Sequence, residues 1–288
     1  MKVIVFYEPQ IVFNERLDSF DKVLYLNDYI RANDNSRKDN ISLHDNYDLF
    51  VVNSNDLSGV NNHVMENIGG IINQLQGLFN FKNVYMNNPT KTTLRSLKNV
   101  FDIEINEPYL LQSVTKEKII SVDSEFDKYI VGQSSAKEQI IKNLIKLLRR
   151  ANTKPLVLRL YGNPGIGKTE TAKFLAKQLN DGEIIREQMS MVYGEESLRY
   201  FKSTHHSENS FSKKLLNRTS NVILLDEFVR TPSYIQDSFL QMFDEGIYED
   251  NNYSVDVRNS VIICTSNFLT ETDMRKNIDN ALLNRFDA

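Results

Sequence analysis

The sequence predicts an α/β fold in two domains, each built from strands that alternate with helices. Short apolar runs typical of buried strands recur along the chain, and segments with helical spacing of apolar residues lie between them. The length of 288 residues suits about two domains at roughly 150 residues each. Hydrophobic residues make up 41% and charged residues 25%, which excludes a disordered chain. We therefore expect an N-terminal domain over residues 1–122 and a second domain over residues 123–288.

The N-terminal segment predicts a small α/β domain, Rossmann-like or receiver-like. Its periodic segments predict helices at residues 60–79 and 90–100, and the polar residues 33–46 predict an exposed loop. Its apolar runs predict buried strands. These strands are expected at residues 3–7, 23–26, 49–52, 84–86 and 103–105.

The order of these elements loosely resembles a receiver domain, which is a phospho-acceptor module. That family has an aspartate after the third strand and a lysine before a proline after the fifth, whereas this chain has Asn53 and Glu107. Both departures remove the phosphoryl chemistry. The expected strand ends carry Glu8, Asn27, Asn53 and Asn87, without a glycine-rich phosphate loop. We expect a recognition or adaptor domain without an active site.

The second domain begins with a predicted linker near residues 115–124 and an amphipathic helix over residues 134–150. A buried strand is expected at residues 155–161, and a helix at residues 170–179. Between them lies Gly-Asn-Pro-Gly-Ile-Gly-Lys-Thr, residues 162–169. This segment fits the pattern G-x-x-x-x-G-K-[ST] in the context that the pattern requires, after a strand and before a helix.

The glycine-rich loop predicts a phosphate-binding site for ATP. Its glycines let backbone N–H groups close around a phosphate, and the following helix offers its positive N-terminus. The Lys168 ammonium would reach the β- and γ-phosphates, and the Thr169 hydroxyl would hold Mg²⁺. The loop residues expected to bind the nucleotide are Gly162, Asn163, Pro164, Gly165, Ile166, Gly167, Lys168 and Thr169.

Two later strands carry the polar groups that ATP hydrolysis requires. Residues 222–225 form an apolar run that ends in Asp226 and Glu227. In ATPases with this loop, such an aspartate holds the Mg²⁺ shell and an adjacent glutamate polarises the attacking water. A further apolar run at residues 261–264 leads into Asn267, whose side chain could touch both the γ-phosphate and the water.

From Lys128 onwards the chain resembles the AAA+ ATPases, specifically the Clp-type protein unfoldases and disaggregases. The motifs occur in the family order. They are Ile130-Val131-Gly132-Gln133, the Walker A loop at residues 162–169, the Walker B end Asp226-Glu227, the helix and hairpin at residues 240–246 and 255–259, Asn267 in Thr-Ser-Asn, and Asn284-Arg285-Phe286-Asp287. The resemblance implies a P-loop AAA+ domain with a parallel sheet.

The resemblance also implies roles for single residues. Ile130 and Val131 would flank the adenine base, and Asn267 would be the residue called sensor 1. Arg285 would be an arginine finger, which acts on the nucleotide of a neighbouring subunit. A finger that acts in this way requires self-association, so we expect a homo-oligomer, either a ring or a partial ring.

Several features depart from the Clp pattern. The family grips polypeptide with a Gly-Tyr-Val-Gly loop between Walker A and Walker B, and no such loop is present in this window. The nearest aromatic candidates are Tyr200 and Phe201, which could equally pack in the core. The family usually has Ile-Glu-Lys after Walker B, where this chain has residues 228–230, Phe-Val-Arg. The sequence ends at Ala288, before the family's C-terminal lid, and either a lidless protein or a truncated one would explain that end.

Two functions fit this set of motifs. The first is a Mg-ATP-binding and ATP-hydrolysing AAA+ protein, an oligomer that remodels a protein partner chosen by the N-terminal domain. The alternative is an ATP-gated assembly or signalling switch with little turnover. The complete set of Lys168, Asp226, Glu227, Asn267 and Arg285 favours the first function. The unclear pore loop and the absent lid favour the second.

Composition narrows the partners and the compartment. The net charge of −4 argues against nucleic acid as a partner. The single cysteine, Cys264, excludes a disulfide framework and lies in an apolar run, where we expect a small core residue. The N-terminal apolar run is too short for a signal peptide, and no run of about 18 apolar residues suggests a membrane span. We expect a cytoplasmic protein that does not bind membranes.

Overall fold

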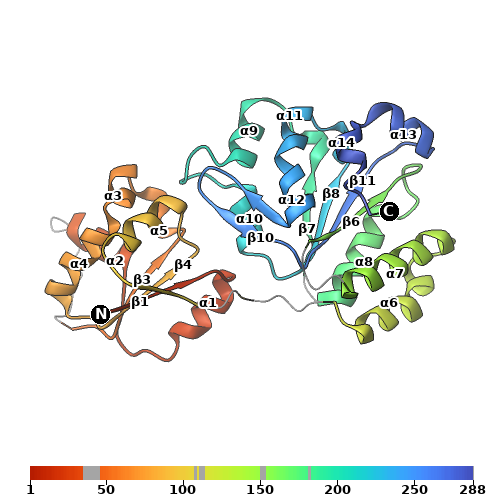
Figure 1. Cartoon of the computed structure of the whole chain (residues 1–288). Coiled ribbons are helices and arrows are strands. Elements are labelled where there is room, and N and C mark those ends of the chain that lie inside the picture. Colours follow the sequence, from red (N-terminus) through yellow and green to blue (C-terminus); the bar gives the residue numbers. More distant parts are fainter. Residues whose placement is uncertain (35–45, 107–108, 110–113, 150–153, 181–182, 288) are drawn as a thin grey trace. The chain divides into compact units, whose positions relative to one another are not determined.

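The structure in Figure 1 is a computed structural model of the chain. It divides into two compact units, Met1–Tyr109 with Ser203–Asn209 and Leu110–Lys202 with Ser210–Ala288, which are described separately below. All strand pairs in the two larger sheets of the described chain are parallel, so the predicted α/β class is confirmed. The residues that the structure describes are 1–34, 46–106, 109, 114–149, 154–180 and 183–287.

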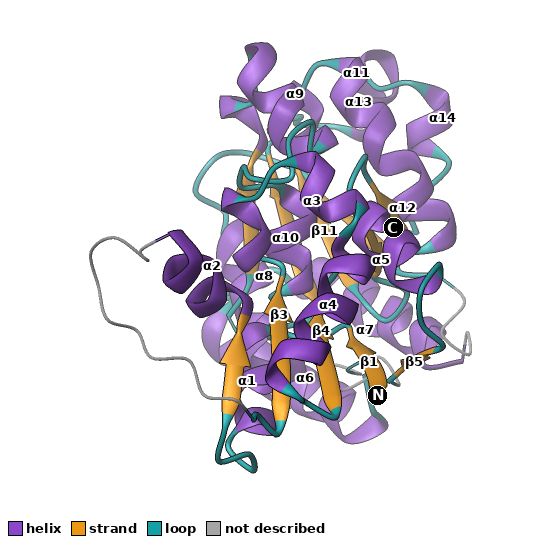
Figure 2. Cartoon of the chain, turned by 90° about the vertical axis from the view of Figure 1, so that its left-hand side faces the viewer, coloured by secondary structure: helices purple, strands orange, loops and turns teal. Residues whose placement is uncertain are grey.

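The first unit contains a five-stranded parallel sheet with helices on both faces. Its strands are β1 (Lys2–Phe6), β2 (Val23–Tyr25), β3 (Leu49–Asn53), β4 (Asn83–Asn87) and β5 (Ile103–Ile105). Its helices are α1 (Gln10–Leu17), α2 (Leu26–Asp34), α3 (Asn62–Glu66), α4 (Ile68–Phe79) and α5 (Lys91–Lys98). Figure 2 shows the strands of this unit side by side, pointing the same way.

The five predicted strands are all present, and the helix predicted over residues 90–100 is α5, but the other helices differ from the prediction. Helices α1 and α2 have no counterpart in it. The helix expected over residues 60–79 is two helices, because Asn67 between α3 and α4 has φ −114° and ψ 9°, which is not helical. In the polar segment 33–46, residues 33 and 34 lie in α2, and residues 35–45 lie outside the described residues.

The strand order of the first unit corrects the expected Rossmann-like or receiver-like topology. The order is β2-β3-β4-β1-β5, whereas a receiver sheet runs 2-1-3-4-5 and a Rossmann sheet 3-2-1-4-5-6. Strand β1 pairs with β4 and β5, not with β2. The apolar runs predict that strands exist, but the tertiary packing of the crossover helices decides which strands become neighbours. Glu107 and Pro108, which the receiver comparison used, lie outside the described residues.

The second unit is built around a four-stranded parallel sheet in the order β6-β11-β8-β7. Its strands are β6 (Leu156–Leu160), β7 (Ile185–Gln188), β8 (Val222–Asp226) and β11 (Val261–Thr265), with a separate hairpin of β9 (Ile247–Glu249) and β10 (Ser254–Asp256). Its helices are α6 (Lys116–Tyr129), α7 (Ser134–Arg149), α8 (Lys168–Asn180), α9 (Gly194–Lys202), α10 (Phe211–Leu216), α11 (Ser233–Gln236), α12 (Leu240–Glu245), α13 (Glu271–Asn277) and α14 (Asn280–Leu283).

The predicted linker at residues 115–124 is wrong, because this segment forms most of helix α6. The Thr115 side chain caps the helix by accepting a hydrogen bond from the Lys118 N–H. Ile119, Val122 and Phe126 follow at helical spacing and are buried. They pack in the same core as α7 and α8, so α6 is a structural part of the second unit.

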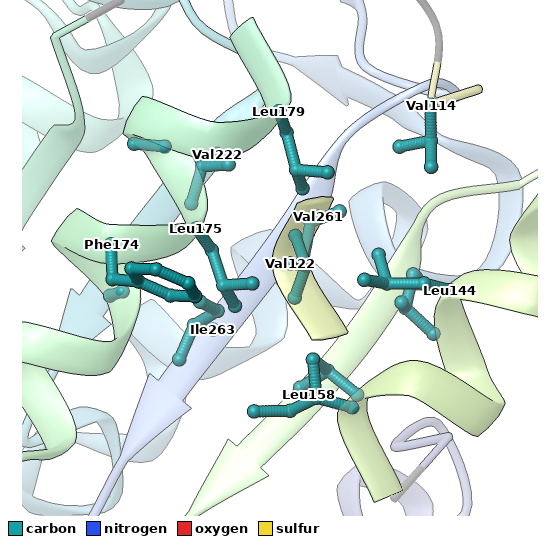
Figure 3. Packing of buried hydrophobic residues seen from close by; sticks show 14 of the residues in the cluster. Val114, Val122, Leu144, Leu158, Phe174, Leu175, Leu179, Val222, Val261 and Ile263 are labelled. Atoms are coloured by element: carbon teal, nitrogen blue, oxygen red, sulfur yellow. The ribbon is translucent and has the colours of Figure 1, made fainter. Parts of the chain in front are cut away.

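The core of the second unit joins one sheet face to helices α6, α7 and α8 (Figure 3). Leu175 and Leu179 of α8 lie in the same buried cluster as Val261 and Ile263 of β11. Because α8 begins at the end of the glycine-rich loop, this packing fixes the loop against the sheet. Among the described residues no helix is long and apolar enough to span a membrane.

Candidate active site

The glycine-rich loop connects β6 to α8 and adopts at three positions a backbone that favours glycine. Gly162, Gly165 and Gly167 have φ angles of 131°, 83° and 92°. A Cβ atom on Gly162 would also lie 2.6 Å from Cδ1 of Ile166. The loop can therefore turn tightly and bring its N–H groups to the start of α8, which is the arrangement that binds phosphate.

Lys168 is held at the mouth of this loop by three oxygen atoms. Its Nζ donates to the carbonyl oxygens of Gly162 at 2.7 Å and Asn163 at 2.9 Å, and to Oδ1 of Asn267 at 3.1 Å. Burial lowers the pKa of the Lys168 ammonium, and the nearby carboxylates of Asp226 and Glu227 oppose that shift. These hydrogen bonds hold the Lys168 ammonium beside the position expected for phosphate.

Asp226 is the last residue of strand β8 and Glu227 follows it, and their carboxylates contact different partners. Asp226 is buried, and its Oδ1 accepts a hydrogen bond from the Thr265 hydroxyl at 2.5 Å. Glu227 has the left-handed backbone angles φ 55° and ψ 38°, so the chain turns sharply after the strand. The Thr265 hydroxyl oxygen also accepts from the Glu227 N–H at 2.8 Å, which fixes this turn to strand β11.

Asn267 links the two motifs across the site. Its Oδ1 accepts from Lys168, while its Nδ2 donates to Oε1 of Glu227 at 3.4 Å. The second carboxylate oxygen of Glu227, Oε2, is 3.0 Å from Nη1 of Arg230. A single amide therefore connects the cation of the glycine-rich loop to the carboxylate at the end of β8.

One open cleft of about 360 Å³ is lined by the polar side chains described above, with the exception of Arg230. The cleft contains Thr169 and Asp226, whose oxygens are the hard ligands that Mg²⁺ prefers. The donor set therefore fits that ion. Its lining residues are Pro164, Gly165, Gly167, Lys168, Thr169, Glu170, Arg186, Gln188, Asp226, Glu227, Thr265 and Asn267. Arg186, Gln188 and Thr265 were not predicted as site residues, because their place depends on strand pairing and not on a local motif.

A second pocket, of about 580 Å³, shares Lys168 with this cleft and is more apolar. Gln133 lines it and donates through Nε2 to the Ile166 carbonyl at 3.3 Å. Ile130 is buried and Val131 is 82% exposed, and neither is among the residues that line this pocket. The apolar lining comes instead from Ala136, Ile140, Leu158, Leu160, Tyr161 and Ile166.

Arg285 lies apart from both pockets, in a contact within its own chain. Its Nε is 2.7 Å from Oδ2 of Asp244 on α12, and its Nη1 donates to the Ala281 carbonyl. Two residues further on, Asp287 accepts from and donates to the backbone of Val157 in β6. The end of the described chain is thereby anchored to the strand that leads into the glycine-rich loop.

The aromatic candidates for a polypeptide-gripping loop are packed inside the second unit. Phe201 is buried, with its ring centroid 5.6 Å from that of Phe211. The Tyr200 hydroxyl donates to Oε1 of Glu187 at 2.8 Å, and burial raises the pKa of that hydroxyl. Both side chains therefore contribute to packing.

Comparison with known proteins finds similarity in part of the second unit. Residues 154–287 match the family model described as AAA domain (Cdc48 subfamily). The chain is 31% identical over 169 residues to the AAA+ ATPase ClpV1 of Pseudomonas aeruginosa, which covers 54% of this chain and 18% of that protein. It is 28% identical over 186 residues to the chaperone protein ClpB of Clostridium tetani, covering 59% of this chain and 22% of that protein. The chaperone protein ClpB of Aquifex aeolicus is 30% identical over 173 residues, covering 54% of this chain and 17% of that protein.

The chain therefore spans about a fifth of the length of the curated relatives that it matches. The residues matched by the family model, 154–287, include the glycine-rich loop and all the residues that line the cleft.

Proposed function

We propose, from the premise that residues 154–287 belong to the AAA+ ATPases of the Clp type, that this chain binds Mg-ATP and hydrolyses it. The phosphates of ATP would lie in the cleft at the glycine-rich loop, and its adenine ring would enter the adjoining apolar pocket. The observation that carries the proposal is the amide of Asn267, which contacts both Lys168 and Glu227. This contact brings the phosphate-binding cation and the candidate base into one site.

Each side chain has a definite task in this proposal. The backbone N–H groups of the glycine-rich loop and the Lys168 ammonium bind and orient the phosphates. Thr169 and Asp226 would hold Mg²⁺, which supplies charge neutralisation between the β- and γ-phosphates when it is bound. Glu227 accepts a proton from the attacking water at its carboxylate, and Asn267 orients that carboxylate.

Calorimetry with ATP and Mg²⁺ tests the binding step. Lys168→Ala removes the cation that the loop carbonyls hold, so ATP binding should fall below detection. The matched control is Lys177→Ala, which removes an exposed lysine in the last turn of the same helix α8 that is not among the residues lining the cleft. Binding of ATP to the Lys168→Ala variant with the affinity of wild type would overturn the proposal.

We further propose that turnover requires a homo-oligomer in which Arg285 acts on a neighbouring nucleotide, and that the assembly acts on a protein partner in the cytoplasm. The support is the motif match around Arg285 and the finding that Arg285 is not among the residues that line its own cleft. The alternative function, an ATP-gated switch with little turnover, is favoured by the ion pair of Arg285 with Asp244 in the same chain.

A mixing experiment separates these two functions. Arg285→Ala has an intact glycine-rich loop, and Lys168→Ala has an intact finger. If the finger acts between subunits, each variant alone is inactive and the mixture recovers part of the activity. Fingers in related systems contribute about 10³–10⁵ in rate, so recovery would stand clear of the background. A fully active Arg285→Ala variant would exclude a finger at this position, and an inactive wild type under assembling conditions would favour the switch.

A further inference from the structure

Arg186 is a cation in the cleft that neither the motifs nor the proposed chemistry uses. It lies on β7, the edge strand of the sheet, and its side chain is 45% exposed. Its Nη2 is 2.6 Å from Oδ2 of Asp226, on the adjacent strand β8. The same nitrogen lies 3.0 Å from Oε1 of Gln188, two residues along β7 and therefore on the same face of the sheet.

With this ion pair, both carboxylate oxygens of Asp226 have partners within the chain. Oδ1 accepts from Thr265, and Oδ2 accepts from Arg186. Asp226 is buried, so its charge is poorly screened by solvent and its partners matter more than at a surface. A divalent cation that approaches Oδ2 meets the positive guanidinium at the same oxygen. The two cations therefore exclude each other.

We propose that Arg186 competes with the divalent cation for Asp226 and so sets the concentration of Mg²⁺ at which the cleft takes up metal and nucleotide together. Gln188 retains the guanidinium when it leaves Asp226, because its Oε1 is already within hydrogen-bond distance. Gln188 is itself fixed by donating through Nε2 to the Ser190 hydroxyl at 2.9 Å. This inference rests on the proposed function, since it assumes that Asp226 holds the metal ion.

The expected size of the effect follows from the fraction of molecules in which Asp226 is free. The apparent dissociation constant of a ligand equals its intrinsic constant divided by the fraction of the binding-competent form. If the ion pair is formed in about nine molecules out of ten, removing Arg186 strengthens metal binding about tenfold. Lysine keeps the charge but loses the planar fork that fits Asp226 and Gln188 together, so Arg186→Lys should give a smaller increase.

The test is a titration with Mn²⁺, followed by electron paramagnetic resonance, on the full chain with a non-hydrolysable ATP analogue. Arg186→Gln should lower the apparent dissociation constant of Mn²⁺ about tenfold, and Arg186→Lys by less. The matched control is Arg199→Gln, which removes an exposed arginine of α9 that pairs with Glu195 and should leave Mn²⁺ binding unchanged. A merely structural role of Arg186 would not strengthen metal binding, so the direction of the change identifies the competition.

Three outcomes decide the matter. Tighter Mn²⁺ binding by Arg186→Gln, lost again in the double variant with Asp226→Asn, supports the competition. Unchanged or weaker binding by Arg186→Gln, while wild type binds Mn²⁺ normally, overturns it and leaves the proposed function standing. Failure of the folded wild type and of Arg186→Gln alike to bind Mn²⁺ with the analogue overturns the proposed function, and the competition with it.

Discussion

Both units place polar residues at the carboxyl ends of their parallel strands, but the surroundings of these residues differ between the two units. In the first unit the polar residues at the ends of β1 and β4 contact one another. Glu8 is buried, its Oε1 lies 2.7 Å from Nε of Arg16, and Asn87 and Asn88 both donate to its carbonyl oxygen. In the second unit the corresponding residues surround an open cleft behind a glycine-rich loop.

The difference between the two units lies in the loops that follow the strands and not in the sheets. Parallel sheets bring the carboxyl ends of their strands together in both units. In the second unit, three glycines with positive φ let the connection to α8 curve around a space. In the first unit, the connection from β4 to α5 runs through Asn88, Pro89 and Thr90. The Asn88 side chain donates to the Glu8 carbonyl, and the Thr90 hydroxyl contacts the Thr93 hydroxyl of α5. Fold class alone therefore carries little information on function.

The sharpest test of this comparison is the exchange of a carboxylate for an amide in each unit. Glu227→Gln removes the candidate base and should lower ATP turnover about 10²–10⁴-fold while ATP binding is kept, because the amide cannot accept the proton. Glu8→Gln changes the carboxylate at the edge of the first sheet and should leave turnover unchanged. Steady-state ATPase assays measure both. Equal rates for wild type and Glu227→Gln would remove the catalytic distinction between the two units.

A smaller effect is expected from the amide that joins the two motifs. Asn267→Leu keeps the volume but breaks the contacts to Lys168 and Glu227. Turnover should fall about 10–100-fold, since an unoriented base is less efficient, and calorimetry should show ATP affinity changed much less. Asn53→Leu is the counterpart at the end of β3 in the first unit and should leave turnover at the wild-type value. A loss of ATP binding as large as the loss of turnover would instead make Asn267 a binding residue.

In the first unit the expected effects are on stability. Glu8→Gln removes the charge on the buried side of the ion pair with Arg16. The Arg16 side chain is 42% exposed, so water can solvate its guanidinium when the ion pair is lost. The free energy of unfolding should fall by about 1–2 kcal/mol. Urea unfolding followed by circular dichroism measures this change. The control is Glu104→Gln, which removes an exposed pair with Lys2 and should have a much smaller effect. A stability equal to that of wild type would mean that the Glu8 pair does not support the fold.

The smallest effect is a pH dependence at Asp56. Burial raises the pKa of this carboxyl, and the charge of Asp28 raises it further, against hydrogen bonds from the Asn53 N–H and the Asn27 side chain. The folded protein therefore binds the proton more tightly than the unfolded chain does. As pH falls from the raised folded pKa towards the ordinary aspartate value, wild type should gain stability relative to Asp56→Asn. Urea unfolding at a series of pH values tests this, and a constant difference between the two proteins would contradict it.

The sequence allowed the glycine-rich loop, the two carboxylates at the end of β8 and the strand before Asn267 to be located, because each is a short contiguous pattern. It did not reveal helix α6, which was expected to be a linker. The apolar residues of α6 have helical spacing, but they are few and lie among charged residues. They are buried only because they pack in a common core with α7 and α8. It also did not reveal that the pocket next to the loop is lined by Ile140 and Tyr161 and not by Ile130 and Val131.

What the sequence by itself determined is the local chemistry of the second unit, since the positions of Gly162, Gly165 and Gly167 within eight residues dictate the shape of their own backbone. Only the tertiary structure decided which side chains meet. The strand order of the first unit, the contact of Asn267 with two motifs, and the pairing of Arg186 with Asp226 each join residues far apart in the chain. The physical reason is that such contacts depend on which strands lie side by side and in which register. Packing of the whole core sets both, and no short segment encodes them.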